Sequence, residues 1–444
     1  MLRNMGERLD QKSEIKKTQG LNPPVALGSL NHIISKAVKD GASDIHIEPR
    51  EQFVWVRYRI GNSLQLATKL SLNNLEALVS AGKKMTGLRV SEHQQPQEAE
   101  LDMTINGQDH RIHLSIIPVL GGEKMVIHLS PRSSKFISLQ NLGFWGNNLS
   151  LIQRVLGQLR GVITVASSDR NSGSLTLVGM VNLLNHPTIK LAAVGDSTID
   201  HLHSASRIKI DPSKGLTPDR SLRLILRQDP DVILVSNLEG NDTLKMILET
   251  AHKKLVCVSL LAQDISSLLQ RLSSMALEPS LLASTMRVAV SQTVVRQLCS
   301  HCRESYTPTA AVKQQLEPLL EIFSAQQLHD LEKQALQSGL GSEITQLSSS
   351  PIEILRLWRP RQGGCEHCEH SGFQRYITLN EVVDTSDPKI QNLFIKSELR
   401  RTQIQAATLK ANMLPKHVDG FIKCLRGLVS INDVFEVARM GGYV

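Results

Sequence analysis

The sequence predicts an α/β protein in which a small α+β domain precedes a larger domain built on a parallel sheet. Two patterns carry this prediction. In the first third of the chain apolar and polar residues alternate, which is typical of strands with one solvated face. After residue 150 short runs are almost entirely apolar, which is typical of parallel strands covered on both faces. Two Cys-x-x-Cys pairs further along predict a metal-binding module, and a helical region ends the chain.

The chain opens with a polar stretch, residues 1–25, which ends near the turn-forming Asn22-Pro23-Pro24 and which we interpret as a tail or linker. Its first 19 residues contain no apolar core of about 7–15 residues, so we expect no signal peptide. The chain has no run of about 18 apolar residues either, so we expect no membrane-spanning helix.

Residues 26–140 form the predicted α+β domain. It begins with apolar residues at helical spacing between 27 and 38. Three alternating strands follow, near 54–60, 111–116 and 125–129, and on each of them apolar side chains share one face while arginine or histidine side chains lie on the other. The pattern predicts a half-buried sheet with one basic face.

Residues 145–298 form the predicted parallel-sheet domain. Helical segments separate its four apolar runs, which are Val162–Ala166, Leu191–Val194, Val232–Val235 and Leu255–Leu260. Residues 299–375 hold the cysteine pairs, with a Gln-, Ser- and Leu-rich stretch of helical spacing at 308–350 inserted between them. We interpret residues 376–444 as a helical C-terminal cap.

Residues 161–176 have the layout of a phosphate-binding loop: an apolar strand, a turn of small residues and the start of a helix. A working loop reads G-x-x-x-x-G-K-[ST], because glycines let backbone N–H groups approach phosphates and the lysine neutralises them. Aligned on Ser174, the two glycines fall on Ser167 and Ser172, and the lysine falls on Gly173. Arg170 adds a positive charge to this loop, and the N-terminus of a helix attracts anions. The alternative is that Ser174 caps the helix and Arg170 is solvated.

The four paired cysteines predict a structural zinc site. Cys299 and Cys302 form one pair, Cys365 and Cys368 the other, and four thiolates complete a closed tetrahedral Zn²⁺ site. The alternative is two pairs of unbound thiols. The remaining two cysteines, Cys257 and Cys424, fit core thiols better.

The net charge of +8 favours acidic partners, which include an anionic membrane surface, an acidic protein surface or nucleic acid. A modest excess of solvated lysine and arginine explains the charge equally well. Aromatic residues make up only 3% of the chain, which argues against stacking of nucleic-acid bases. Asp44, His46 and Glu48 share one face of a strand, and without a nucleophile or further ligand we interpret that face as structural or interfacial.

Several motifs resemble those of the type II secretion and type IV pilus assembly ATPases (GspE/PilB type). Residues 42–49 read ASDIHIEP and resemble the opening strand motif of that family, and residues 226–235 read LRQDPDVILV and resemble its Walker B strand. Further matches follow in the family's order at 276–284, 295–302, 364–368 and 427–434. Together they cover roughly residues 28–440.

The resemblance implies a PAS-like N-terminal domain, a RecA-like P-loop domain and a helical excursion between the cysteine pairs. It also implies a hexameric ring in the cytoplasm that docks on an inner-membrane platform and binds ATP between its subunits. Asp231 falls where the Walker B aspartate would hold Mg²⁺, so the residual nucleotide pocket would consist of Arg170, Ser174 and Asp231. The alternative is that Asp231 caps the end of a strand. No nucleic-acid partner is expected.

The chain departs from the family at most positions that carry catalysis. The Walker A lysine falls on Gly173, the glutamate of the acidic box on Gly195, the water-polarising glutamate on Asn237, the histidine of the histidine box on Leu261, and the arginine-rich stretch on residues 93–100. Loss of arginine fingers alone costs about 10³–10⁵ in rate in comparable enzymes.

These losses predict a catalytically inactive member of the family, with no catalytic residues of its own, that acts as a structural or regulatory subunit. It would join a mixed ring with an active paralogue or occupy the platform in its place. The first alternative is an active ATP-hydrolysing motor that works despite an aberrant loop. The second is a nucleic-acid-binding zinc protein, suggested by the charge and the cysteine pairs but without a basic helix beside them.

Overall fold

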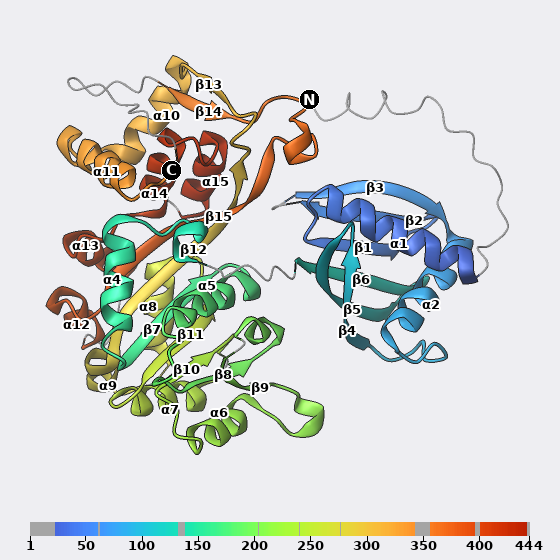
Figure 1. Cartoon of the computed structure of the whole chain (residues 1–444), viewed down its shortest axis with the longest axis horizontal. Helices are drawn as coiled ribbons and strands as arrows, with labels where there is room; N and C mark the ends of the chain where they lie inside the picture. The colour runs from blue at the N-terminus through green and yellow to red at the C-terminus, as the bar shows by residue number, and fades with distance from the viewer. Residues whose placement is uncertain are drawn as a thin grey trace. The chain divides into compact units, whose positions relative to one another are not determined.

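A computed structural model of the chain describes residues 23–60, 63–131, 138–202, 204–238, 240–275, 277–341, 356–395 and 400–441. The chain divides into two compact units, Met1–Ser133 and Ser134–Val444, which we call the N-terminal and C-terminal units. Figure 1 shows both. The first 22 residues, which we interpreted as a tail, lie outside the described residues.

The N-terminal unit is a six-stranded antiparallel sheet in the order β3-β2-β1-β6-β5-β4, with two helices packed on one face. Its helices are α1 (Pro23–Lys39) and α2 (Leu75–Thr86), with a short 3-10 turn η1 (Leu72–Asn74) before the second. Its strands are β1 (Asp44–Pro49), β2 (Phe53–Ile60), β3 (Ser63–Ser71), β4 (Gln97–Ile105), β5 (Gln108–Val119) and β6 (Gly122–Pro131).

The predicted alternation explains this unit. Ile45 and Ile47 of β1 and Val54 and Val56 of β2 are fully buried in one core with the helices, while their neighbours along each strand point to the open face. The two edge strands β3 and β4 were not predicted. Most of their apolar residues are only partly buried, Leu66 of β3 is exposed, and only Ile105 at the end of β4 reaches the core, so the apolar pattern of these edge strands is weaker.

The C-terminal unit is built on a seven-stranded sheet in the order β15-β12-β7-β11-β10-β8-β9. All neighbouring strands are parallel except β15, which is antiparallel to β12. The four predicted apolar runs are confirmed as β7 (Gly161–Ser167), β8 (Leu191–Gly195), β10 (Val232–Val235) and β11 (Leu255–Leu261). Three strands were not predicted as parts of this sheet: β9 (Ser206–Lys209), β12 (Met286–Leu298) and β15 (Phe373–Asp384).

Helices cover both faces of this sheet, as the apolar runs predicted (Figure 1). One face packs against α3 (Leu139–Leu142), α4 (Gly146–Leu156) and α5 (Arg170–Asn182). The other packs against α6 (Pro218–Leu226), α7 (Asn241–Ala251), α8 (Ile265–Ser274), α9 (Pro279–Thr285), α12 (Pro388–Phe394) and α13 (Arg401–Lys410). Two 3-10 turns, η2 (Ser197–His201) and η3 (Pro212–Lys214), lie beside β9.

A third apolar cluster joins the cysteine module to the end of the chain. It includes residues of α10 (Ala310–Leu320), α11 (Ala325–Gln337), α14 (Lys416–Leu425) and α15 (Ile431–Met440), next to the small sheet of β13 (Glu304–Tyr306) and β14 (Leu357–Arg359). The insertion at 308–350 is therefore helical over its described part. One boundary prediction is wrong: residues 376–384 are not helical but belong to β15, whose mixed apolar and polar sequence shows neither strict alternation nor a continuous apolar run.

A buried ion pair ties these helices to the sheet. Asp419 and Lys423, one turn apart on α14, are both fully buried and form a salt bridge. Asp419 also accepts hydrogen bonds from the indole N–H of Trp145 (2.7 Å) and the backbone N–H of Asn380 in β15 (2.8 Å), and Lys423 donates to the Thr378 carbonyl oxygen (2.7 Å). Burial raises the pKa of Asp419 and lowers the pKa of Lys423, so each charge depends on the other.

None of the helices in the described part of the chain is long and apolar enough to cross a membrane.

Asp419→Asn should destabilise the C-terminal unit by about 3–5 kcal/mol, because it leaves the Lys423 ammonium buried without a counter-charge. Urea unfolding followed by circular dichroism measures the change. Asp211→Asn is the matched control, because Asp211 pairs with the exposed Lys214, and it should shift stability by less than about 0.5 kcal/mol. Equal stability of the two variants would contradict the structural role of the buried pair.

Candidate functional site

The segment that resembles a phosphate-binding loop folds as a capped helix. β7 ends at Ser167 and α5 begins at Arg170, so only Ser168 and Asp169 lie between them. The positions that would form the loop, 167–172, therefore begin in the strand and end inside the first turn of the helix. A backbone that continues directly into a helix leaves no open ring of N–H groups around a phosphate.

Asp169 is the residue that caps this helix. One of its carboxylate oxygens accepts from the backbone N–H groups of Asn171 (3.0 Å) and Ser172 (2.8 Å), and the other accepts from the Ser172 hydroxyl (2.5 Å). These are the donors that an anion at the helix N-terminus would use. The protein's own carboxylate therefore occupies the position of a bound anion.

The interior of the predicted loop is packed with hydroxyl groups. Ser174 is fully buried inside α5, and its Oγ lies 3.0 Å from Oγ of Ser259 in β11. A Cβ added at Gly173 would lie 2.7 Å from Oγ of Ser167, so any side chain at the lysine position must first displace that hydroxyl. Ser174 thus lies in the helix that follows β7, and its hydroxyl contacts the hydroxyl of Ser259.

A second group of polar residues lies at the same edge of the sheet, after β8 and β10. Asn237 donates a side-chain hydrogen bond to the carboxylate of Asp196, and its backbone N–H donates to Oγ of Ser259 (2.8 Å). The backbone N–H of Asp196 donates to Oγ of Ser236 (3.1 Å). Asp196 also caps the turn η2 through the backbone N–H and the hydroxyl of Thr198.

Gly195 and Ser236 fit together so closely that Gly195 cannot take a side chain unless Ser236 moves. A Cβ built at Gly195 would lie 1.9 Å from Oγ of Ser236. The resemblance aligns a glutamate with Gly195 and a glycine with Ser236. In the structure the side chain of Ser236, which follows the neighbouring strand β10, lies where a side chain at Gly195 would begin.

Asp231 does not belong to this site, which corrects the prediction. It immediately precedes β10, and its carboxylate accepts from the backbone N–H of Lys190 (2.8 Å) at the start of β8. The register places Val232 beside Leu255, which pairs with Gly161 at the start of β7. The whole of β7, 7 residues or about 23 Å, therefore separates the level of Asp231 from the end of that strand. The predicted apolar strand is confirmed as β10, but Asp231 lies at its N-terminal end, away from the segment that follows β7.

Arg170 is the first residue of α5, but its side chain lies outside the described residues. Of the three residues predicted for a residual nucleotide pocket, Arg170 and Ser174 both belong to α5, which follows the end of β7, whereas Asp231 lies at the opposite ends of the strands. Sequence reasoning missed Asp169, although an Asp before a helix start with small polar residues after it is a recognisable N-cap signal.

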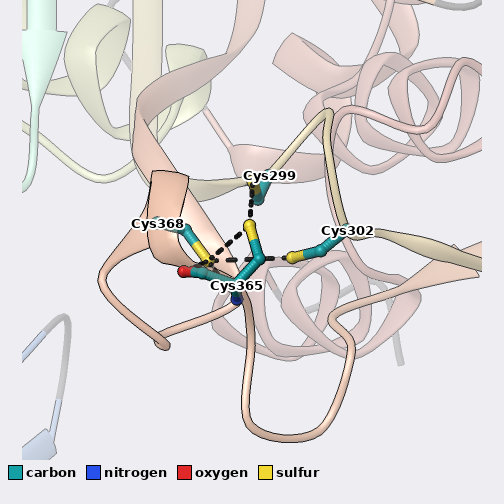
Figure 2. A group of neighbouring side chains, drawn as sticks. All are labelled: Cys299, Cys302, Cys365 and Cys368. Atoms are coloured by element: carbon teal, nitrogen blue, oxygen red, sulfur yellow. Dashed lines mark hydrogen bonds between the residues drawn. The ribbon is translucent and has the colours of Figure 1, made fainter.

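The four predicted cysteines come together in the cysteine module (Figure 2). Their sulfur atoms all lie within 4.8 Å of one another. Three sulfur–sulfur distances are 3.8 Å (Cys299–Cys365), 3.7 Å (Cys302–Cys368) and 3.6 Å (Cys365–Cys368). Four thiolates bound tetrahedrally at about 2.3 Å from one ion would lie roughly 3.8 Å apart. The cluster can therefore hold a metal ion.

Two strands position these cysteines. Cys299 directly follows β12, and Cys365 and Cys368 lie at the short turn η4 (Glu366–Cys368) that precedes β15. Since β12 and β15 pair along their whole length, the pairing brings the two cysteine pairs together despite the insertion between them.

The thiolate form is favoured at one of the four. Burial disfavours the Cys368 thiolate, but the backbone N–H groups of Cys365 (3.1 Å) and Gly372 (3.2 Å) donate to its sulfur, and the pKa falls to about 6. By contrast, burial in the sheet raises the pKa of Cys257 to about 12, as suits a core thiol.

His301 and His367 stack on each other outside the cluster, with ring centroids 4.1 Å apart.

Comparison with known proteins identifies the family. Residues 22–436 match the family described as "Type II/IV secretion system protein". The chain belongs to this family. The predicted resemblance is thereby confirmed over nearly the whole chain.

Relatives within this secretion family include both types named by the resemblance. The chain is 28% identical to the "Type II secretion system ATPase E" of Vibrio cholerae, over 98% of this chain and 79% of that protein. It is 26% identical to the "Type IV pilus assembly ATPase PilB" of Thermus thermophilus, over 95% of this chain. It spans only 44% of the Thermus protein's length.

Solved structures share the fold. The Legionella pneumophila ATPase DotB superposes with a TM-score of 0.59 at 14% identity, covering 96% of this chain and 98% of DotB. The pilus retraction motor PilT, solved with ADP, gives a TM-score of 0.53 at 15% identity, covering 92% of this chain and 96% of PilT. At these identities the likeness concerns the architecture alone.

Cys365→Ser should remove about one equivalent of bound divalent metal per chain and lower the thermal midpoint, because a serine hydroxyl is a poor replacement for a thiolate ligand. Elemental analysis and thermal unfolding measure the two effects. Cys424→Ala is the control: Cys424 is buried but lies outside the cluster, so this variant should keep the metal. Unchanged metal content in Cys365→Ser would contradict the site.

Proposed function

We propose that this chain is a subunit of a type II secretion or type IV pilus assembly machine that does not hydrolyse ATP and acts as a structural or regulatory component. The observation that supports this most directly is the Asp169 carboxylate on the N-terminus of α5. A phosphate group would have to displace that carboxylate and then lie beside its negative charge. This arrangement therefore disfavours the binding of ATP, the ligand that the names of the ATPase relatives imply.

The lost lysine adds to this effect. A charge-assisted contact of the kind that the lysine makes is worth about 1.5–3 kcal/mol. The position now holds Gly173, packed against the Ser167 hydroxyl, so the charge cannot return without rearrangement of that contact. The absence of a lysine at Gly173 removes an attraction for a phosphate, and the Asp169 carboxylate repels the same phosphate.

The rest of the site supports the same proposal. Asn237 stands where a water-polarising glutamate is expected. It has no carboxylate, and its side-chain amide donates a hydrogen bond to Asp196. In the N-terminal unit, the stretch expected to hold arginine fingers runs into β4, where Glu98 and Glu100 carry negative charge instead. Phosphoryl transfer depends on positioning of the attacking water and on neutralisation of charge at the phosphate. Asn237 in place of a glutamate removes a group that would position the water, and the lack of arginines in residues 93–100, which carry Glu98 and Glu100, removes charge neutralisation.

We further propose that the four cysteines hold Zn²⁺ as a structural ion. A closed set of four thiolates with no open position suits zinc and leaves no place for a catalytic water. The ion would fix the insertion to the sheet without a role in chemistry.

Family membership supports the choice of partners. We propose a hexameric ring, either of this chain alone or mixed with an active paralogue, at the cytoplasmic side of an inner-membrane platform, together with the cytoplasmic assembly proteins of the same machine. No nucleic-acid partner is proposed.

The alternative is an active motor, which the names of the relatives favour, since both are called ATPases. The two functions differ in one measurement: binding and turnover of Mg²⁺-ATP by the purified, metal-loaded chain, alone and with the host's active paralogue. We expect no binding in the micromolar range and no turnover by the chain alone, and in the mixture either a changed rate or a stable complex. The active paralogue alone is the positive control.

Turnover by this chain alone would refute the proposal and establish the motor. Asp169→Lys then helps to locate the activity: if turnover arises at α5, a change at its cap should alter it. Asp231→Asn is the matched control, because Asp231 lies at the opposite edge of the sheet.

Gly195→Glu should destabilise the C-terminal unit by about 1–3 kcal/mol, because the new side chain collides with the Ser236 hydroxyl. The double variant Gly195→Glu with Ser236→Gly should recover most of that loss. Chemical denaturation of the single and double variants measures the coupling. Additive effects would contradict the view that the two positions changed together to close the pocket.

A further inference from the structure

The turn between β5 and β6 of the N-terminal unit carries an apolar tip that lies outside the core. Leu120 and Gly121 connect the two strands, and Leu120 is fully exposed, at 100%. Ile117 and Val119, on the last part of β5, are 40% and 36% exposed. Hairpin turns are usually built from glycine and polar residues. Three neighbouring apolar side chains in solvent at such a turn are typical of a surface that is covered by a partner.

The strand register places this tip beside a row of charged and aromatic side chains on the open face of the sheet, opposite α1 and α2. Ile117 pairs with Lys124 of β6, and Lys124 forms a 2.7 Å ion pair with Glu48 of β1. Glu48 pairs with Trp55 of β2, and Trp55 pairs with Lys69 of β3. Directly paired residues of neighbouring strands have their side chains on the same face. The row therefore runs from the apolar hairpin across the sheet to its edge.

Three cations surround the indole ring of Trp55. The guanidinium groups of Arg50 and Arg57 lie 5.5 Å and 5.9 Å from the ring centroid, and the ammonium group of Lys69 lies 5.8 Å from it. The same ammonium group lies 6.0 Å from the ring of Phe53. Both aromatic rings are partly exposed. Because a cation within about 6 Å of an aromatic ring is attracted to it, the positive charges are held around the two rings.

Cations outnumber carboxylates in this part of the face. Glu48 is buried and is shared by Arg57 at 2.5 Å, Lys124 at 2.7 Å and Arg50 at 3.5 Å. Glu51, in the turn between β1 and β2, is exposed. With the lysine beside the aromatic rings, four cations stand against two carboxylates. The excess of positive charge attracts an anionic partner.

We propose that this part of the N-terminal unit binds the surface of an anionic lipid bilayer. We call it the hairpin surface, and it consists of Arg50, Trp55, Lys69, Ile117, Val119 and Leu120. The three aliphatic side chains enter the boundary between headgroups and acyl chains, as the apolar faces of peripheral proteins do. The indole ring lies at headgroup level, where tryptophan is enriched, and the cations contact lipid phosphates.

The shape of the tip favours a bilayer over an acidic protein. Leu120 projects from a turn at the end of two strands and is fully exposed, so it offers an anchor and not a groove. A protein partner would need a pocket that matches this anchor, whereas the acyl boundary of a bilayer accepts an apolar tip of any shape. The proposal concerns the N-terminal unit alone and does not depend on whether the chain hydrolyses ATP.

The test is flotation of the whole chain with vesicles of phosphatidylcholine alone and with vesicles that also contain phosphatidylglycerol. We expect binding to the anionic vesicles only, and weaker binding at high salt, because salt screens the attraction between the cations and the lipid. Leu120→Asp should weaken binding about tenfold by removing the apolar anchor, and Lys69→Glu should do the same through charge.

A second readout locates the contact. Brominated lipids in the anionic vesicles should quench tryptophan emission of the wild type, and Trp55→Phe should lose most of that quenching. The other two tryptophans, Trp145 and Trp358, belong to the C-terminal unit and should contribute little.

Ile322→Asp and Lys245→Glu are the matched controls. Ile322 is 52% exposed and Lys245 is exposed on α7, and both belong to the C-terminal unit. These variants change apolar surface and charge by the same amounts and should bind vesicles like the wild type. A wild type that does not float with anionic vesicles would overturn the proposal, as would binding that Leu120→Asp and Lys69→Glu leave unchanged. If Leu120→Asp instead abolishes self-association and spares vesicle binding, the tip contacts a second copy and the proposal is wrong.

Discussion

The pairing of β12 with β15 is the constraint on which the C-terminal unit depends. β12 pairs in parallel with β7, the strand that leads into the capped helix α5, and antiparallel with β15 on its other side. It therefore joins the candidate nucleotide site to the C-terminal part of the chain. The same pairing brings the two cysteine pairs to one place. It also sets Asn380 against the buried Asp419, so a single ladder of backbone hydrogen bonds positions the cysteine cluster and the last helices relative to the sheet.

Sequence reasoning captured what depends on local pattern and missed what depends on position in the sheet. The four continuous apolar runs became parallel strands, and the cysteine spacing led to the cluster, because both signals are local. Asp231 was misplaced, because it precedes the apolar run 232–235 and so lies at the N-terminal end of β10, whereas the segment after β7 lies at the C-terminal ends of the parallel strands. β15 was taken for the start of a helix, because buried Thr378, Asn380 and Glu381 interrupt its apolar residues and leave no regular strand pattern.

At the candidate nucleotide site the structure connects positions that the sequence presents one by one. In the sequence, Gly173, Gly195 and Asn237 are separate departures from the family's motifs. In the structure Asp169 caps the helix that holds Gly173, Ser236 lies where a side chain at Gly195 would extend, and Asn237 donates a hydrogen bond to Asp196. The polar groups of this site therefore have partners within the protein, which supports the proposed structural role.

β15 lies much later in the sequence than β12, its neighbour in the sheet, and this order has a consequence for synthesis. Before residue 373 leaves the ribosome, β12 has its partner β7 but presents its other edge to solvent, with buried-type residues such as Val288, Val290 and Val295 alongside. Such an edge pairs readily with the edges of other chains. Nascent and C-terminally truncated forms of this protein are therefore the ones exposed to aggregation, and the emergence of the last strand closes that period.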